Sequence, residues 1–376
     1  MIWTQTWAVL VDAYRDLNSR KMFWVVLILS ALVMMGFATL GVNERGLKFL
    51  WWQFPGDIGG PEGARLFYKG IFSWLVIGFY LTWAATILAL ISTSGIFPDF
   101  MTGGAIDLYL SKPIGRWRLF FTKYVSGLLF VALQVAVFAL VSFVVLGMRG
   151  GTWEPSLFLA IPIVVVFFSY LYGICVLFGV MTRSTIAALL LTILAWFFIW
   201  GVDQVDKGLT SALKFAPRQK AFAKRQLERV DRQIAAKEGM ATTRETEEDA
   251  ATSGPATARD QELERLKSER AMWVRQSEAE GPPAWLGNVQ KTVVAVKTFV
   301  PKTRETTALL DRFLLPDWEI AKAAAKGEEE RGEPEMELAQ MDPTRGRSVW
   351  WIVGSSLMFE VFCVGLAGWV FVRRDY

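Results

Sequence analysis

Histidine is absent from this sequence, and cysteine occurs only as Cys175 and Cys363. Without histidine the chain lacks the commonest general base and metal ligand. Two cysteines cannot build a disulfide framework or a zinc site, and both lie in apolar stretches, where a lone cysteine is usually a small packing residue. No G-x-x-x-x-G-K-[ST] motif is present, so the chain has no loop of its own for ATP phosphates. We therefore expect neither an enzyme nor a metal or cofactor held by this chain.

Charged residues are scarce outside residues 203–347, and the rest of the chain is rich in apolar residues. Hydrophobic residues make up 53% of the 376 residues, with 17 Trp and 27 Phe. A helix needs about 20 apolar residues to cross the core of a bilayer. Six stretches meet or approach this length, namely 22–40, 71–92, 119–147, 157–180, 185–202 and 349–372. The sequence predicts an all-α polytopic membrane protein with six transmembrane helices.

The charged residues indicate how the chain is oriented. Residues 203–347 hold 25 Lys or Arg and 26 Asp or Glu, whereas basic residues elsewhere gather at the ends of the apolar stretches. Short loops richer in Lys and Arg face the cytoplasm. Ten such residues fall on the side of the N-terminus and five on the other side. We expect both termini in the cytoplasm, residues 203–347 outside it, and contacts with membrane lipids rather than with nucleic acid.

The chain then divides into four parts. Residues 1–21 place Trp and Leu residues on one helical face, which is typical of a cytoplasmic helix in the membrane interface. Residues 22–202 hold the first five spans, residues 203–347 form an extracytoplasmic insert, and residues 348–376 hold the sixth span and a cytoplasmic end.

The insert is predicted to contain a helical hairpin over about 214–280. Its arms, 214–238 and 260–280, are charged and almost free of Gly and Pro. The facing apolar residues are Phe222, Leu227, Val230 and Ile234 on the first arm and Leu263, Leu266, Trp273 and Val274 on the second. The sequence is compatible with two roles, a solvated hairpin without a partner and a coiled coil that docks an extracytoplasmic partner. Helices over about 285–325 are expected to lie against the outer membrane surface.

One cytoplasmic loop has an unusual pattern, "FPDFMTGGAIDLYLSKPIGRWRLFFTKY", residues 97–124. Gly103 and Gly104 permit a turn before a short helix at about 104–110. Pro113 is tolerated only in the first turn of a helix, where its missing N–H has no partner to lose. It therefore begins a new helix that runs through Arg116 into the third span. Arg116 and Lys123 are expected to hold this end among lipid phosphates.

This stretch resembles the region after the second helix in type-2 ABC transporter permeases. The matching residues are Asp99, Gly104, Leu110, Ser111, Lys112, Pro113, Ile114, Arg116 and Lys123. The sequence departs from the family pattern at Ala105, where Thr is usual, and at Thr122, where Gly usually precedes the Lys. The resemblance covers the six spans and the two cytoplasmic elements but not the charged insert.

The resemblance implies a coupling helix that seats in a groove of a separate ATPase subunit, which binds ATP and Mg²⁺. The residues implied in coupling are Asp99, Gly103, Gly104, Ile106, Asp107, Leu108, Tyr109, Ser111, Pro113 and Arg116. Two ATPase copies and a second permease, identical or paralogous, would complete an exporter in a bacterial cytoplasmic membrane. An ordinary basic loop is the plain alternative for this stretch.

Two polar residues within the spans are candidates for a functional site. Glu360 lies near the middle of the last span, and an intramembrane carboxyl group is a candidate functional group by default. The alternative is a Glu that only bonds a neighbouring helix, with Gln134 as the expected partner. For the whole chain, the sequence also leaves open a non-transporting ABC subunit that moves an external partner, and a membrane-anchored coiled-coil scaffold.

Overall fold

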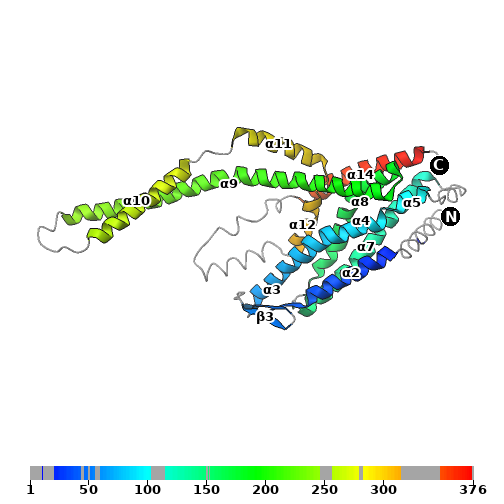
Figure 1. Cartoon of the computed structure of the whole chain (residues 1–376), viewed down its shortest axis with the longest axis horizontal. Coiled ribbons are helices and arrows are strands. Elements are labelled where there is room, and N and C mark those ends of the chain that lie inside the picture. The colour runs from blue at the N-terminus through cyan, green and yellow to red at the C-terminus, as the bar shows by residue number, and fades with distance from the viewer. Residues whose placement is uncertain are drawn as a thin grey trace. The chain divides into compact units, whose positions relative to one another are not determined.

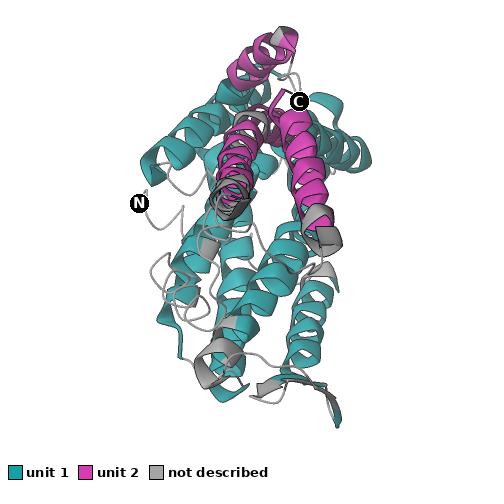
Figure 2. Ribbon diagram, turned by 90° about the vertical axis from the view of Figure 1, so that its left-hand side faces the viewer, with its two compact units in different colours: residues 1–201, 297–376 teal, residues 202–296 magenta. Residues whose placement is uncertain are grey.

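The computed structural model describes residues 11, 21–43, 46–49, 51–55, 60–102, 115–149, 151, 153–245, 256–278, 283–314 and 348–374. They form two compact units, which Figure 2 shows in different colours. Residues 1–201 and 297–376 make up the first unit, called the helical body below, and residues 202–296 make up the second.

Among the residues that the structure describes, five helical segments are long and apolar enough to cross a membrane. They are Phe67–Met101, Arg116–Arg149, Pro155–Thr182, Thr185–Leu213 and Val349–Arg373. Each overlaps one of the predicted spans, because a run of about 20 apolar residues is a local property of the sequence. The chain is thus a helical integral membrane protein. The first predicted span corresponds to helix α2, Lys21–Ala38, whose apolar part Trp24–Ala38 is shorter than the other five.

The helical body contains α2, four of the five long segments and the start of the other, Thr185–Leu213, up to residue 201. α7 (Arg116–Arg149), α8 (Ala160–Thr182, after the short helix η2, Pro155–Leu159) and α14 (Val349–Arg373) pack against one another. α4 (Thr86–Thr93) contacts α2 and α8. These helices run side by side in Figure 1. Aromatic rings pack together at one end of these helices. The ring centroid of Phe120 lies 5.6 Å from that of Phe371 and 5.0 Å from that of Phe97.

The second predicted span is not a uniform α-helix. α3 (Gly60–Ile71) leads into a π-helix, η1 (Phe72–Ala85), which is followed by α4 and by α5 (Ile96–Thr102). The hydroxyls of Thr82 and Thr86 donate to carbonyl oxygens five residues earlier, at Ile77 and Leu81. A π-helix is wider than an α-helix and is often found at functional sites.

A small antiparallel sheet follows α2, so the expectation of an all-α protein is incomplete. β1 (Leu40–Asn43) pairs with β2 (Gly46–Phe49), which pairs with β3 (Trp52–Pro55). Asn43 pairs with Gly46 and Phe49 with Trp52, which leaves a two-residue loop in each hairpin. Two-residue loops are the commonest hairpin connection. No strand was predicted for this part of the sequence.

The second unit contains most of the long helix α9 (Thr185–Glu245), the helix α10 (Ala256–Glu278) and most of α11 (Ala284–Phe299). The rings of Phe222 and Trp273 meet edge to face at 5.8 Å, and Arg270 forms an ion pair of 2.7 Å with Asp231. α9 and α10 therefore contact each other through residues of both predicted arms. The expected boundary after Val202 falls inside α9, which is one helix throughout.

Helix α12 (Thr303–Leu314) belongs to the helical body, although its sequence lies in the predicted insert. Its side chains Leu309, Leu310 and Leu314 are buried, and it packs against α8, α14, η1 and η2. This part of 285–325 thus covers its apolar face with protein rather than with a membrane surface. An amphipathic pattern demands an apolar neighbour but does not specify which one.

Candidate functional site

Glu360 lies deep in the helical body and joins three helices. It is the twelfth residue of the 25-residue α14, about 17 Å from the first residue at 1.5 Å per residue. Its side chain is 9% exposed. The Tyr124 hydroxyl on α7 donates to Oε1 at 2.8 Å, and the Ser169 hydroxyl on α8 bonds Oε2 at 2.6 Å. Among the described residues, no Lys or Arg forms an ion pair with this carboxyl group.

The hydrogen bonds of Ser169 can accommodate either charge state of Glu360. Ser169 Oγ also lies 2.8 Å from the carbonyl oxygen of Val166, which can only accept. A serine hydroxyl has one proton. Both contacts are hydrogen bonds at the same time only when Glu360 carries a proton and donates it to Ser169. When Glu360 is ionised, Ser169 turns its proton toward the carboxylate. The group can therefore gain or lose a proton without moving its heavy atoms.

Stacked aromatic rings extend from this carboxyl group along α8. The ring of Tyr124 stacks on Tyr172 with centroids 5.1 Å apart, and Tyr172 stacks on Phe168 at 5.6 Å. Tyr172 is fully buried. The stack therefore connects Phe168 to the side chain that donates to Glu360.

Two glycines allow the helices to come close enough for these contacts. A Cβ at Gly127 of α7 would lie 2.5 Å from the Tyr172 hydroxyl oxygen. A Cβ at Gly173 of α8 would lie 3.3 Å from Val364 and 3.6 Å from the Cγ of Glu360. Small residues at helix contacts let transmembrane helices approach closely. The position of Glu360 between α7 and α8 thus depends on both glycines.

Gln134, the expected partner of Glu360, is not its partner. The two hydrogen bonds of the carboxyl group go to Tyr124 and Ser169, whereas Gln134 lies ten residues farther along α7 and lines a separate cavity. The acid was predicted from the sequence, but neither Tyr124 nor Ser169 was. Their signal was weak, because Tyr and Ser are ordinary residues in a span until the helix faces that meet are known.

Two other sequence-predicted residues, Asp99 on α5 and Arg116 at the start of α7, flank residues 103–114 in the sequence. Thr185, the first residue of α9, donates to Asp99 of α5 at 3.2 Å. Arg116, the first residue of α7, donates to the carbonyl oxygens of Val372 and Arg374 at 2.9 and 3.1 Å. Side chains on α5 and α7 thus contact α9 and the end of α14.

Arg374 adds a further contact at the same place. Its guanidinium donates to the carbonyl oxygens of Val180 and Met181, the latter at 3.0 Å, at the end of α8. These carbonyls are among the last four of a helix, which have no partner within it. The ends of α7, α8 and α14 are therefore joined by arginine side chains.

Arg116 and Lys123, which were expected among lipid phosphates, both have contacts within the protein. Arg116 uses its guanidinium on the end of α14. Lys123 is buried, with its ammonium 5.4 Å from the centroid of the Phe100 ring. A cation over an aromatic face is attracted by the ring quadrupole. Both cations thus contact neighbouring helices.

The remaining candidates for coupling lie outside the described residues. They are Gly103, Gly104, Ile106, Asp107, Leu108, Tyr109, Ser111 and Pro113. Within the part of the chain that the structure describes, no group of three or more Cys, Asp or Glu side chains could hold a metal ion. Comparisons with models of protein families, with curated proteins and with solved structures found no match.

Proposed function

We propose that the chain is the membrane-spanning subunit of an ABC transporter, an exporter driven by a separate ATPase. In this proposal α2 is the first of six transmembrane helices and both termini lie in the cytoplasm. The complex contains a second permease, identical or paralogous, and two ATPase subunits that bind ATP and Mg²⁺. The starting point is the resemblance of residues 97–124 to the coupling region of type-2 ABC permeases.

The main structural support for the proposal is a set of hydrogen bonds between the ends of helices that flank residues 103–114 in the sequence. A segment that receives motion from a partner must be joined firmly to the helices that it moves. α5 precedes this segment in the chain, and its Asp99 accepts a hydrogen bond from Thr185 of α9. α7 follows the segment, and its Arg116 donates hydrogen bonds to the end of α14. Arg374 joins the same end of α14 to α8. A push on residues 103–114 would therefore reach five helices together.

Glu360 is the proposed site at which this movement acts on the substrate path or on a proton. It lies between α7, α8 and α14, the helices whose ends Arg116 and Arg374 connect. A relative shift of these helices would part the carboxyl group from Tyr124 or Ser169. An acid that loses such bonds within a membrane must find another partner or change its protonation state.

A second candidate function is a membrane subunit that passes ATPase motion to a partner outside the membrane without transport. α9 favours it, because the fifth apolar segment and the first arm of the insert belong to one helix, Thr185–Glu245. Transport of a ligand by the reconstituted complex would exclude this candidate. A membrane-anchored scaffold without an ATPase remains the third candidate from the sequence.

The proposal is tested by replacing the apolar side of the expected coupling helix. The tagged chain is extracted in mild detergent, and co-purifying proteins are identified together with their Mg²⁺-dependent ATPase activity. A double variant with Leu108→Asp and Tyr109→Asp places two unpaired charges in a contact that should exclude water, which costs several kcal/mol. We expect normal membrane insertion and dimer formation but loss of the ATPase.

The matched control puts the same two charges on an exposed part of α10. Ala271 and Met272 are both exposed, so Ala271→Asp with Met272→Asp should leave the composition of the complex unchanged. If no ATPase co-purifies with the unaltered chain, or if the Leu108 and Tyr109 variant keeps its ATPase, residues 104–110 do not couple to an ATPase and the proposal is wrong.

A further inference from the structure

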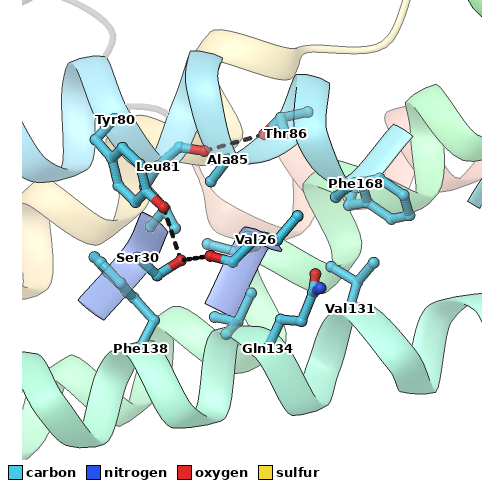
Figure 3. Close-up of a pocket in the computed structure, with 13 residues that line it drawn as sticks. Val26, Ser30, Tyr80, Leu81, Ala85, Thr86, Val131, Gln134, Phe138 and Phe168 are labelled. Atoms are coloured by element: carbon cyan, nitrogen blue, oxygen red, sulfur yellow. Dashed lines mark hydrogen bonds between the residues drawn. The ribbon is translucent and has the colours of Figure 1, made fainter. Parts of the chain in front are cut away.

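A cavity of about 30 Å³ lies inside the helical body, between α2, η1, α4, α7 and α8 (Figure 3). This is room for about two water-sized groups. Most of its wall is apolar, with Val131, Val135 and Phe138 from α7 and Phe168 from α8. No charged side chain is among the described residues that line it.

The described residues that line the cavity include four with polar side chains, and three of these have hydrogen-bond partners within the protein. Ser30 donates to the carbonyl oxygen of Val26 at 2.8 Å, and Tyr80 then donates to Ser30 at 2.7 Å. Thr86 donates to the carbonyl oxygen of Leu81 at 3.0 Å. Figure 3 draws these bonds as dashed lines. None of these three hydroxyl protons is available for a further acceptor.

Gln134 is the exception. Its side chain is 7% exposed, and its Nε2 has no hydrogen-bond partner among the described residues. Figure 3 shows the amide pointing from α7 into the space between the labelled side chains. A buried donor without a partner carries its full desolvation penalty. An apolar occupant such as a lipid tail would not remove this penalty, whereas an occupant with an oxygen atom would.

We propose that this cavity is a binding subsite for the hydroxyl or carbonyl end of an uncharged, membrane-soluble molecule, that is, for the oxygen and the carbon beside it. The Gln134 amide bonds the oxygen, and Val131, Val135 and Phe138 contact the carbon next to it. Ionised molecules are excluded because the described residues of the wall carry no opposite charge and burial of an unpaired charge is costly.

The wall of the subsite also connects to Glu360. Phe168 lines the cavity and begins the stack that continues through Tyr172 to Tyr124, the donor to Glu360. An occupant that contacts Phe168 therefore acts on the hydrogen bond of the carboxyl group. In the transporter proposed above, on which this last step rests, uncharged amphipathic molecules are the substrate class.

Binding is tested on the full chain alone, in lipid nanodiscs and without ATPase, so that the result does not depend on the transporter proposal. The probe is octanol that carries a photoreactive diazirine, and the labelled residues are mapped by mass spectrometry. We expect labels on η1, α4 and α7 residues that line the cavity. Excess octan-1-ol and octan-2-one should protect these residues from labelling, while octane should not.

Two variants assign the binding to the cavity. Gln134→Leu keeps a similar volume and should weaken protection by octan-1-ol about three- to tenfold, as expected for one lost hydrogen bond. Ala85→Leu leaves Gln134 in place but fills part of the space, since Ala85 lines the cavity, and should also weaken protection. Ser142→Ala is the control, because Ser142 is buried on α7 and bonds the sulfur of Met34 outside the cavity.

The labelling pattern of the unaltered chain already decides the question, even if a variant fails to fold. Equal protection by octane and octan-1-ol would overturn the proposed role of Gln134. Labels confined to exposed α7 positions such as Leu129 and Leu133 would show only partition of the probe into lipid and would overturn the subsite. A chain that binds octanol but co-purifies with no ATPase would keep this inference and reject the transporter proposal.

Discussion

The hydroxyl of Tyr124 donates a hydrogen bond of 2.8 Å to Glu360, which lies 236 positions later in the chain. The bond brings α7 and α14 together inside the membrane. Ser169 binds the second carboxyl oxygen from α8. The acid therefore stands where three helices meet, and its replacement tests both packing and function.

Replacing Glu360 by Gln should preserve the fold but impair function. Gln has the same shape, and its amide can bond the hydroxyls of Tyr124 and Ser169 without carrying a charge or an exchangeable carboxyl proton. We expect thermal unfolding of the purified chain to change little and substrate-stimulated ATPase activity of the complex to fall. Full activity of Glu360→Gln would leave the acid with a structural role only.

Glu360→Leu is the companion variant for stability. Leu removes both acceptors and leaves the Tyr124 and Ser169 hydroxyls buried, although each retains a backbone carbonyl nearby. The loss of a buried hydrogen bond costs about 0.5–1.5 kcal/mol, and this variant loses two. Thermal unfolding of this variant should therefore occur at a lower temperature than that of Glu360→Gln, and equal values would contradict the structural role of the two bonds.

Gly127→Ala should displace the stacked rings. The added Cβ would lie 2.5 Å from the Tyr172 hydroxyl oxygen, and Tyr172 cannot turn aside because Tyr124 and Phe168 stack on it. Overpacking of this kind costs about 1–3 kcal/mol. Thermal unfolding of the full chain is the measurement. Gly365→Ala on α14 is the control, since its Cβ would meet nothing within 4 Å, and equal effects of the two substitutions would contradict the proposed close contact.

The ion pair between Lys297 and Glu305 should contribute more to stability than an exposed pair. Its nitrogen and oxygen lie 3.1 Å apart, with side chains 11% and 3% exposed. Removal of one partner of a buried pair costs about 3–5 kcal/mol. We expect Glu305→Gln to destabilise the chain in a thermal or denaturant titration. An effect as small as that of the control below would mean that Lys297 finds another partner.

The control for this prediction is the exposed pair of Lys267 and Glu264 on α10, whose side chains are 49% and 74% exposed. Exposed pairs contribute about 0–1 kcal/mol. Glu264→Gln should therefore leave the unfolding transition almost unchanged.

The orientation of the chain is tested by cysteine labelling of intact cells. The native Cys175 and Cys363 are buried and should not react with a thiol reagent that cannot cross the membrane. A cysteine at Ser253 in the insert should react from outside, and one at Ser111 should react only after the membrane is opened, because the basic short loops indicate a cytoplasmic position. The reverse pattern would contradict the proposed orientation and the coupling function with it.

The sequence alone determined that this chain crosses the membrane and approximately where. The length of an apolar stretch and the charges at its ends are local properties of the sequence. Whether such a stretch can cross a bilayer therefore does not depend on how the rest of the chain folds. The same reasoning singled out Glu360, since a carboxyl group in the middle of an apolar run is costly wherever it points.

The contacts of these residues were decided only by the tertiary structure. Tyr124 and Ser169 meet Glu360, and Gln134 instead faces an apolar cavity, because the rotation and depth of each helix follow from the packing of all its neighbours at once. Gly127 and Gly173 set how closely α7 and α8 approach the rings and the acid. The apolar face of α12 met other helices instead of lipid for the same reason. The sequence shows that an apolar helix face will be covered, whereas only the tertiary structure shows which element covers it.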